Sequence, residues 1–248
     1  MTITEHQTQF VTSKKKKIVV LSGAGISAES GIPTFRGANG LWEGHDVTEV
    51  ASPVGWKRDR SLVLEFYNQR RRGMLAAQPN PGHQAIVRLE DKYEVMIITQ
   101  NIDDLHERAG SKRILHLHGE IMKARSTVDP ELIYDLKPGQ DIEVGDKCKK
   151  GSQLRPHIVW FQEDVPEFPR AVMLTALADI VIIVGTSMVV YPANTLVEYA
   201  PDRAQIFLVD PNRPEVSTQR NIEFILEPGG TGLPRLVDRL LEQAAAPE

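Results

Sequence analysis

The chain has 248 residues, of which 41% are hydrophobic and 25% are charged, so it can bury one large core and is not an intrinsically disordered protein. Its formal net charge of -4 creates no broad cationic field, and we expect neither nucleic acid nor a membrane as a partner. The single cysteine, Cys148, excludes an internal disulfide framework and is compatible with a reducing cytoplasm, the compartment we expect.

The chain begins with a polar, aperiodic segment, residues 1–13, which we interpret as a flexible tail. Beyond this segment, short apolar runs alternate with helical patterns. We expect strands at residues 18–21, 95–99, 180–184 and 206–209, and helices at residues 61–74, 83–89, 172–178 and 233–244. Such alternation is typical of an α/β fold with a doubly wound, parallel, Rossmann-like sheet.

Two stretches interrupt the alternation. Residues 37–81 contain two tryptophans, several prolines and a charged helix, while residues 121–154 are polar and weakly periodic. We interpret both as a smaller domain inserted into the sheet domain. The whole catalytic domain would cover residues 14–245, with its larger part at 14–36, 82–120 and 155–245. A ligand site is expected in the cleft between the two parts.

A glycine-rich loop, Gly23-Ala24-Gly25, follows the first expected strand directly. This order of strand, glycine loop and helix is that of a dinucleotide site, in which backbone N–H groups and a helix N-terminus face a pyrophosphate. A tight structural turn is the alternative. A dehydrogenase would continue to a second strand that ends in an acidic ribose ligand. This chain continues through a proline-interrupted loop to Phe35 and Arg36, so hydride transfer is disfavoured.

Polar side chains gather after the expected strand that ends at residue 99. They are Gln100, Asn101, Asp103, His116 and His118. Side chains at the carboxyl ends of parallel strands build the active sites of α/β proteins, and histidine titrates near neutral pH. For each residue taken alone, a buried polar network is the alternative interpretation.

Five sequence blocks together resemble the sirtuin family of NAD-dependent protein deacylases. In chain order they are GAGISAESGIPTFRG (23–37), TQNIDDLHERAG (99–110), LHGE (117–120), HIVWFQE (157–163) and GTS (185–187). They span almost the whole chain in the family's order. The resemblance implies an enzyme that uses NAD, acts on acylated lysines of proteins, and releases nicotinamide, free lysine and O-acyl-ADP-ribose.

The resemblance also implies roles for single residues. His118 would be the general base that takes a proton from the cofactor ribose, while Asn101 and Asp103 would hold the ribose and the nicotinamide carboxamide. The other implied cofactor-binding residues are Gly23, Ala24, Gly25, Phe35, Arg36, Gln100, Ile102, Gly185, Thr186, Ser187, Asp210 and Gly229. The implied substrate channel consists of Val159, Trp160 and Phe161, with Met188 and Val189 at its opposite edge.

Tyr67 and Arg70 are three residues apart on an expected helix and would share one face. A guanidinium can hold a carboxylate through two hydrogen bonds, and a phenol can add a third. The pair resembles that of the sirtuin branch that removes succinyl and malonyl groups, so we expect these activities beside deacetylation. The alternative for the arginines of this helix is a solvated surface.

The chain departs from the family at two places. Most sirtuins bind structural zinc through four cysteines, and Cys148 alone cannot form a tetrahedral thiolate site. We therefore predict no zinc, with a mixed site of Cys148 and carboxylates as the alternative, and we interpret His116 as structural. Asp210 replaces an asparagine that is frequent in the family, and its charge would disfavour a phosphate on the adenosine ribose.

The sequence is compatible with two other functions. One is ADP-ribosyl transfer or NAD hydrolysis in the same pocket, and the other is a non-catalytic NAD sensor. The HIVWFQE block favours deacylation over the first, while Asn101, Asp103 and His118 together disfavour the second. The sequence makes no prediction about oligomeric state.

Overall fold

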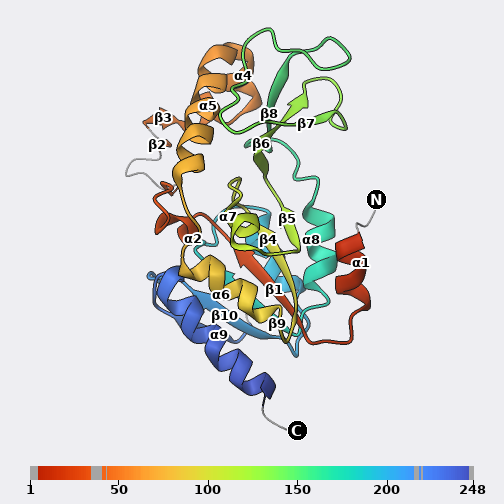
Figure 1. Ribbon diagram of the computed structural model, residues 1–248, viewed down its shortest axis with the longest axis vertical. Helices are drawn as coiled ribbons and strands as arrows, with labels where there is room; N and C mark the ends of the chain where they lie inside the picture. Colours follow the sequence, from red (N-terminus) through yellow and green to blue (C-terminus); the bar gives the residue numbers. More distant parts are fainter. Residues whose placement is uncertain (1–4, 35–40, 43, 215–217, 219, 246–248) are drawn as a thin grey trace.

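A computed structural model describes residues 5–34, 41–42, 44–214, 218 and 220–245. Its centre is a six-stranded sheet in which all neighbouring strands run parallel, in the order β11-β10-β9-β1-β4-β5 (Figure 1). The strands are β1 (Lys17–Ser22), β4 (Glu94–Thr99), β5 (Ile114–His116), β9 (Ile180–Val184), β10 (Gln205–Val209) and β11 (Ile222–Ile225). This sheet confirms the predicted α/β fold, and the four predicted strands all lie within it.

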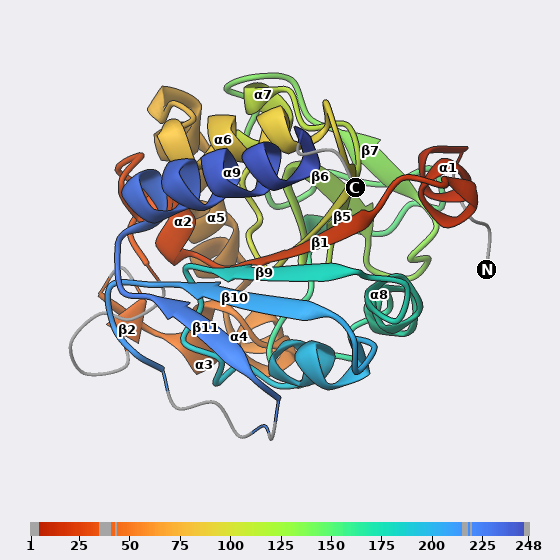
Figure 2. The same ribbon diagram turned by 90° about the horizontal axis from the view of Figure 1, so that it is seen from below.

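Helices cover both faces of this sheet, which explains why its inner strands are apolar runs without alternation. On one face lie α6 (Pro81–Leu89) and α9 (Gly229–Ala245), and on the other lie α8 (Phe168–Thr175) and the 3₁₀ helix η1 (Ala193–Tyr199) (Figure 2). Alternate residues of β1 enter the two cores: Ile18 and Val20 pack toward α6 and α9, whereas Val19 packs toward α8.

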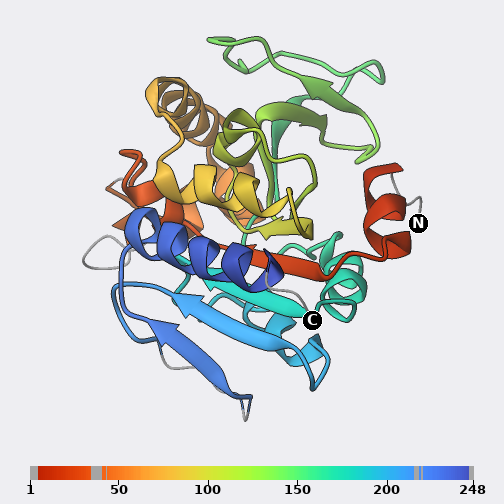
Figure 3. The ribbon, with the colours of Figure 1, turned by 60° about the horizontal axis from the view of Figure 1, so that its bottom comes forward.

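The flexible tail predicted for residues 1–13 is wrong for Glu5–Thr12, which form helix α1. Phe10 is fully buried and belongs to the same core cluster as the residues of α8. Figure 3 shows α1 beside α8 at one end of the sheet. A single buried aromatic residue in an otherwise polar segment produces no apolar periodicity, so the pattern of the sequence did not indicate this helix.

A second, three-stranded antiparallel sheet lies apart from the first (Figure 1). Its central strand β6 (Gly119–Ser126) pairs with β7 (Ile133–Asp135) and β8 (Leu154–Ile158). The remaining helices and strands are α2 (Gly25–Ala28), β2 (Leu41–Trp42), β3 (His45–Asp46), α3 (Val47–Val50), α4 (Pro53–Arg58), α5 (Arg60–Ala76) and α7 (Leu105–Ala109). The three-stranded sheet was not expected, because β6 contains few apolar residues and the alternation of buried and half-buried residues along it is interrupted at Met122 and Lys123.

The small sheet and helix α5 share a third core cluster, which includes Val63, Tyr67, Ile121 and Trp160. Arg71 also joins the two elements: it is fully buried, and its Nε donates to the carbonyl of Ile121 at 2.9 Å. The run of three arginines, residues 70–72, is therefore not exposed to solvent along its whole length. The exact boundaries of the smaller domain stay a prediction.

Cys148 lies in a turn held by hydroxyl groups. Its backbone N–H donates to the carbonyl of Ser152 at 2.8 Å, and its Sγ is 3.4 Å from Ser152 Oγ. Ser152 Oγ in turn is 3.1 Å from Ser126 Oγ. Hydrogen bonds of this kind can connect the two chain segments without a metal ion. Within the described ranges, no group of three or more His, Cys, Asp or Glu side chains could hold a metal ion.

We predict that the purified protein contains no stoichiometric zinc and keeps its melting temperature in a strong chelator, because one thiolate is too few for a structural zinc site. Elemental analysis and thermal melting with and without chelator measure both properties. Cys148→Ser serves as the matched control and should also melt without sensitivity to chelator. Near-equimolar zinc lost together with the fold on chelation would contradict the prediction.

In the part of the chain that the structure describes, no helix combines the length and the apolar composition needed to cross a membrane.

Candidate active site

A cavity of about 1170 Å³ opens at the carboxyl ends of the central parallel strands. Residues that follow strands of the central sheet line it together with residues of β8 and helix α5. The lining includes the predicted residues Gly23, Ala24, Gly25, Gln100, Asn101, Ile102, Asp103, His118, Gly185, Thr186, Ser187 and Asp210. Its volume exceeds the roughly 300–1,000 Å³ of typical small-molecule sites. The cavity can therefore accommodate a dinucleotide together with a second substrate.

The glycine loop is shaped by contact with a second loop. Gly25 N–H donates to the carbonyl of Gly185 at 2.7 Å, and Gly23 N–H donates to Val184 at 3.0 Å. A Cβ on Gly25 would lie 2.6 Å from the Cα of Gly185, whose φ of 60° also favours glycine. The N–H groups of Gly23 and Gly25 therefore hold the two loops together, and the role of the glycine loop in binding a pyrophosphate stays a prediction. The glycines allow the loops after β1 and β9 to touch, and both loops line the cavity.

Asn101 and Asp103 are held by a serine that the sequence analysis did not assign to the site. The buried hydroxyl of Ser27 donates to Asp103 Oδ2 at 3.0 Å, and Asn101 Nδ2 lies 3.2 Å from the same hydroxyl. Burial raises the pKa of Asp103, partly offset by hydrogen bonds from Leu105 N–H and Ser27. Ser27 lies inside the first sequence block, but only the structure brings it against the second.

His118 has a defined tautomer. Its Nδ1 lies 3.1 Å from the carbonyl oxygen of Gln100, and a carbonyl can only accept, so Nδ1 carries the hydrogen. Nε2 then has its lone pair available, and His118 lines the cavity. Burial lowers the pKa of His118 from its ordinary value of 6.5, partly offset by the hydrogen bond to Gln100. The imidazole is therefore neutral near pH 7 and able to accept a proton.

His116, two residues earlier, has a different environment. Its Nδ1 lies 3.1 Å from the carbonyl of Asn101, and its Nε2 lies 2.7 Å from Glu107 Oε1. Burial lowers the pKa of His116, but the hydrogen bond and charge of Glu107 outweigh burial and raise it overall. Both nitrogens of His116 thus face acceptors, and the ring supports the Asn101 backbone instead of lining the cavity.

Tyr67 and Arg70 also line the cavity, where they lie among aromatic side chains. Tyr67 is fully buried, and its hydroxyl accepts a hydrogen bond from Trp160 Nε1 at 3.1 Å. The guanidinium carbon of Arg70 is 4.3 Å from the ring centroid of Trp42. Aromatic faces attract cations, so Trp42 holds the guanidinium beside the phenol. Trp42 was not among the predicted site residues.

The remaining predicted residues divide into three groups. Val159, Trp160, Phe161 and Val189 line the cavity. Met188 does not belong to this lining: it is buried in the core beside α8, with a φ of 56°. Gly229 is also absent from the lining and packs against Val184 and Ile26, although the preceding Pro228 lines the cavity. Phe35 and Arg36 lie outside the described residues.

The residues present fit a dinucleotide. Carboxylates that can accept hydrogen bonds from ribose hydroxyls line the cavity at Asp103 and Asp210. Ser27 and Asn101 add a hydroxyl and an amide near Asp103. Gln100 Nε2 donates to Thr186 Oγ1 at 3.3 Å, which joins the ends of β4 and β9 along the same wall.

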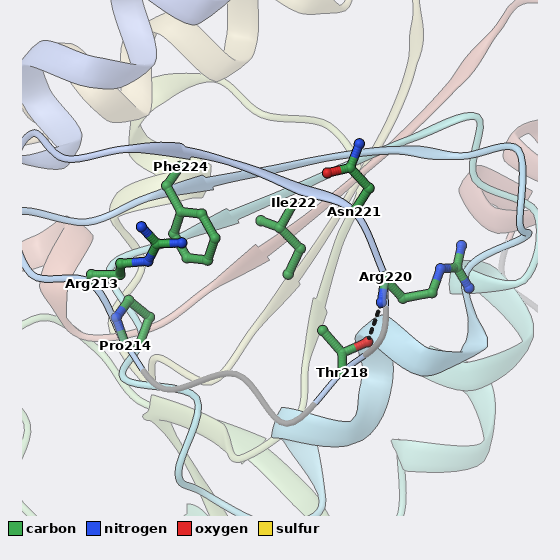
Figure 4. A pocket seen from close by; sticks show the side chains of 7 residues that line it. All are labelled: Arg213, Pro214, Thr218, Arg220, Asn221, Ile222 and Phe224. Atoms are coloured by element: carbon green, nitrogen blue, oxygen red, sulfur yellow. Dashed lines mark hydrogen bonds between the residues drawn. The ribbon is translucent and has the colours of Figure 1, made fainter.

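A smaller cavity of about 570 Å³ lies beside β11 (Figure 4). Figure 4 shows Arg213 beside Phe224 and Arg220 on the other side of this cavity. Arg213 also lines the larger cavity, whereas Arg220 donates to the carbonyl of Ala200 at 2.7 Å. None of the predicted site residues lines the smaller cavity, so the candidate active site is confined to the larger one.

A family profile described as the Sir2 family matches residues 23–192. A Helicobacter pylori protein named NAD-dependent protein deacylase is 52% identical over 230 residues, which cover 93% of this chain and 100% of that protein. A Sir2 homologue mutant solved with ADP ribose is 35% identical, with a TM-score of 0.85 over 99% of this chain and 100% of the other. A Sir2 homologue solved with NAD is also 35% identical, with a TM-score of 0.83 over 98% and 96% of the two chains. The chain therefore belongs to the Sir2 family, the sirtuins, as its five sequence blocks predicted.

Proposed function

We propose that this sirtuin is an NAD-dependent protein lysine deacylase that removes succinyl and malonyl groups as well as acetyl groups. The observation that carries the deacylase assignment is the neutral His118, with Nδ1 bound to Gln100 and Nε2 available in the cavity. The names of its relatives and the ADP ribose and NAD complexes of its structural neighbours support the same assignment.

NAD, when bound, supplies an electrophilic ribose carbon and nicotinamide as the leaving group. His118 Nε2 would accept a proton from a ribose hydroxyl of the bound cofactor, and the Gln100 carbonyl keeps the imidazole in the required tautomer and would stabilise its charge after transfer. Ser27 holds the Asp103 carboxylate beside the amide of Asn101, so both groups would bind the cofactor without first having to be ordered.

Tyr67 and Arg70 are the residues proposed to recognise the acyl group. Both line the cavity, and they present a hydroxyl and a guanidinium to an otherwise aromatic wall. The buried carboxylate of a succinyl or malonyl group needs such partners, since an unpaired buried charge is costly. An acetyl group needs none and also fits, which supports a broad acyl range.

Incubation with NAD and acetyl-, malonyl- or succinyl-lysine peptides tests the proposal. A deacylase releases nicotinamide only with peptide and converts the peptide to free lysine, as mass spectrometry detects. Peptide-independent nicotinamide release would instead indicate NAD hydrolysis or ADP-ribosyl transfer, and no release would indicate a sensor. The proposed partners are acylated proteins in the cytoplasm, a compartment supported by the single cysteine.

The acid limb of the pH profile of kcat is expected below pH 6.5, because the pKa of His118 is lowered from 6.5. A base works only when neutral, so a lowered pKa keeps His118 active to lower pH, and activity falls when the pH drops through that pKa. Turnover from pH 5 to 8 measures the limb. An NMR titration of the His118 ring, identified by comparison with His118→Ala, separates it from Asp103. A His118 pKa above 6.5 would contradict the prediction.

A further inference from the structure

The hydrogen bond between Trp160 and Tyr67 determines whether the Tyr67 hydroxyl donates or accepts. An indole N–H only donates, so Tyr67 Oη must be the acceptor at 3.1 Å. The phenol proton is then directed elsewhere, and no second partner for it occurs among the described residues that pack around Tyr67. Burial raises the pKa of Tyr67 above its ordinary value of 10.0, so the phenol keeps this proton.

Trp160 is itself held by the side chain of Arg155. It is 2% exposed, and its ring centroid is 3.3 Å from the guanidinium carbon of Arg155. A cation held this close to the aromatic face restricts rotation of the indole. Its N–H is thereby kept in the direction of the Tyr67 oxygen, which lies on another element, helix α5.

An ion pair fixes the backbone at Trp160. Arg155 donates from Nη1 and Nη2 to the two carboxylate oxygens of Glu163, at 2.7 and 3.0 Å. Glu163 Oε2 also accepts from the backbone N–H of Trp160 at 2.8 Å. Burial raises the pKa of Glu163, but Arg155 and the Trp160 N–H lower it overall, so the carboxylate is charged.

The turn from Trp160 to Glu163, beside this ion pair, is strained. Gln162, between Trp160 and Glu163, has a φ of 71°, in the left-handed region that non-glycine residues rarely adopt. Glu163 N–H donates to the carbonyl of Trp160 at 3.1 Å and closes the turn. A turn with an unfavourable residue needs other contacts to hold it, and the bidentate pair of Arg155 and Glu163 supplies them.

We propose that the ion pair of Arg155 and Glu163 positions Trp160 so that its indole N–H makes Tyr67 a hydrogen-bond donor to acidic acyl groups. Trp160 is thus a specificity-determining residue, although it has no charge of its own. This inference rests on the proposed reading of succinyl and malonyl groups by Tyr67 and deepens it. Without the indole N–H, nothing fixes the direction of the phenol proton, and binding of the acyl carboxylate weakens.

A double-mutant cycle tests the proposal. Specificity constants for succinyl-lysine and acetyl-lysine peptides are measured for wild type, Trp160→Phe, Tyr67→Phe and the double variant. Trp160→Phe is expected to lower the succinyl-to-acetyl ratio about tenfold, since one hydrogen bond to a charged group is weakened. In the Tyr67→Phe background the same substitution should leave the ratio unchanged. An equal effect in both backgrounds, or equal loss on both peptides, overturns the proposal.

Two further variants separate positioning from packing. Trp56→Phe keeps an aromatic ring beside Trp160, whose ring centroid is 5.6 Å away, and changes packing in the same core cluster but neither the indole N–H nor the ion pair, so it should leave the ratio unchanged. Glu163→Gln removes the charge that binds Arg155 and should lower the ratio in the direction of Trp160→Phe. A Trp56→Phe variant that lowers the ratio as much as Trp160→Phe would show that packing alone is responsible.

An NMR measurement tests the contact between Trp160 and Tyr67 independently of the proposed function. The chain has three tryptophans, so the indole N–H resonance of Trp160 is identified with Trp160→Phe. It should shift upfield in Tyr67→Phe, whatever acyl group the enzyme prefers. An unshifted resonance rejects the contact on which the inference rests. A shifted resonance in an enzyme without activity on succinyl peptides rejects instead the acidic acyl range of the proposed function, and with it Trp160 as a determinant of that range.

Discussion

His118→Ala is expected to lose turnover by a factor of about 10²–10⁴, the usual contribution of a general base. NAD affinity should stay close to that of wild type, because the Nε2 lone pair acts on a proton and the other residues that line the cavity are unchanged. Steady-state deacylation of an acetyl-lysine peptide measures turnover, and calorimetric titration with NAD measures affinity.

His157→Ala is the matched control for this variant. His157 is half-buried on β8, and burial lowers its pKa to about 4, so it too is neutral near pH 7. It does not line the cavity, and its removal should leave turnover within a few-fold of wild type. Near wild-type deacylation by His118→Ala, or equal losses in the two variants, would show that His118 is not the base.

Arg70→Met combined with Tyr67→Phe is expected to lower the specificity constant for succinyl-lysine peptides about a hundredfold more than that for acetyl-lysine peptides. The variant keeps the volume of both side chains and deletes their polar contacts. A carboxylate left without partners in the cavity costs on the order of a few kcal/mol, which corresponds to this ratio. Competition assays with equimolar acetyl and succinyl peptides measure it directly.

Arg72→Met is the control for the double variant. Arg72 lies on the same helix α5 but is exposed and pairs with Glu65 at 3.0 Å and with Asp141. Surface ion pairs contribute little, so this variant should leave the ratio of the two specificity constants unchanged. Equal losses on both peptides in Arg70→Met with Tyr67→Phe would instead assign these residues a general packing role.

The sequence predicted the central sheet because its strands are buried on both faces. Such strands must be continuous apolar runs, and runs at 18–21, 95–99, 180–184 and 206–209 are recognisable without a structure. It missed α1, the strands β6, β7 and β8, and the two outer strands of the central sheet, β5 and β11. These elements lack a continuous apolar run, and their stability comes from packing against partners distant in the sequence.

The family was also predicted from the sequence alone, since five short blocks stand in the family's order, and most of the residues predicted for the site line one cavity. The sequence did not determine the hydrogen-bond partners or the protonation of each group. His116 and His118 stand two residues apart, yet among the described residues one faces acceptors at both nitrogens and the other at Nδ1 alone.

The tertiary structure decided these roles because a side chain's proton affinity and hydrogen-bond direction depend on its neighbours in space. Gln100 determines the tautomer of His118, and Trp160 determines the direction in which Tyr67 can donate. Gly25 and Gly185, 160 positions apart in the numbering, need to be glycines because their backbones touch. The residue types of the site can thus be predicted from the chain, whereas their protonation and orientation follow from the contacts that folding creates.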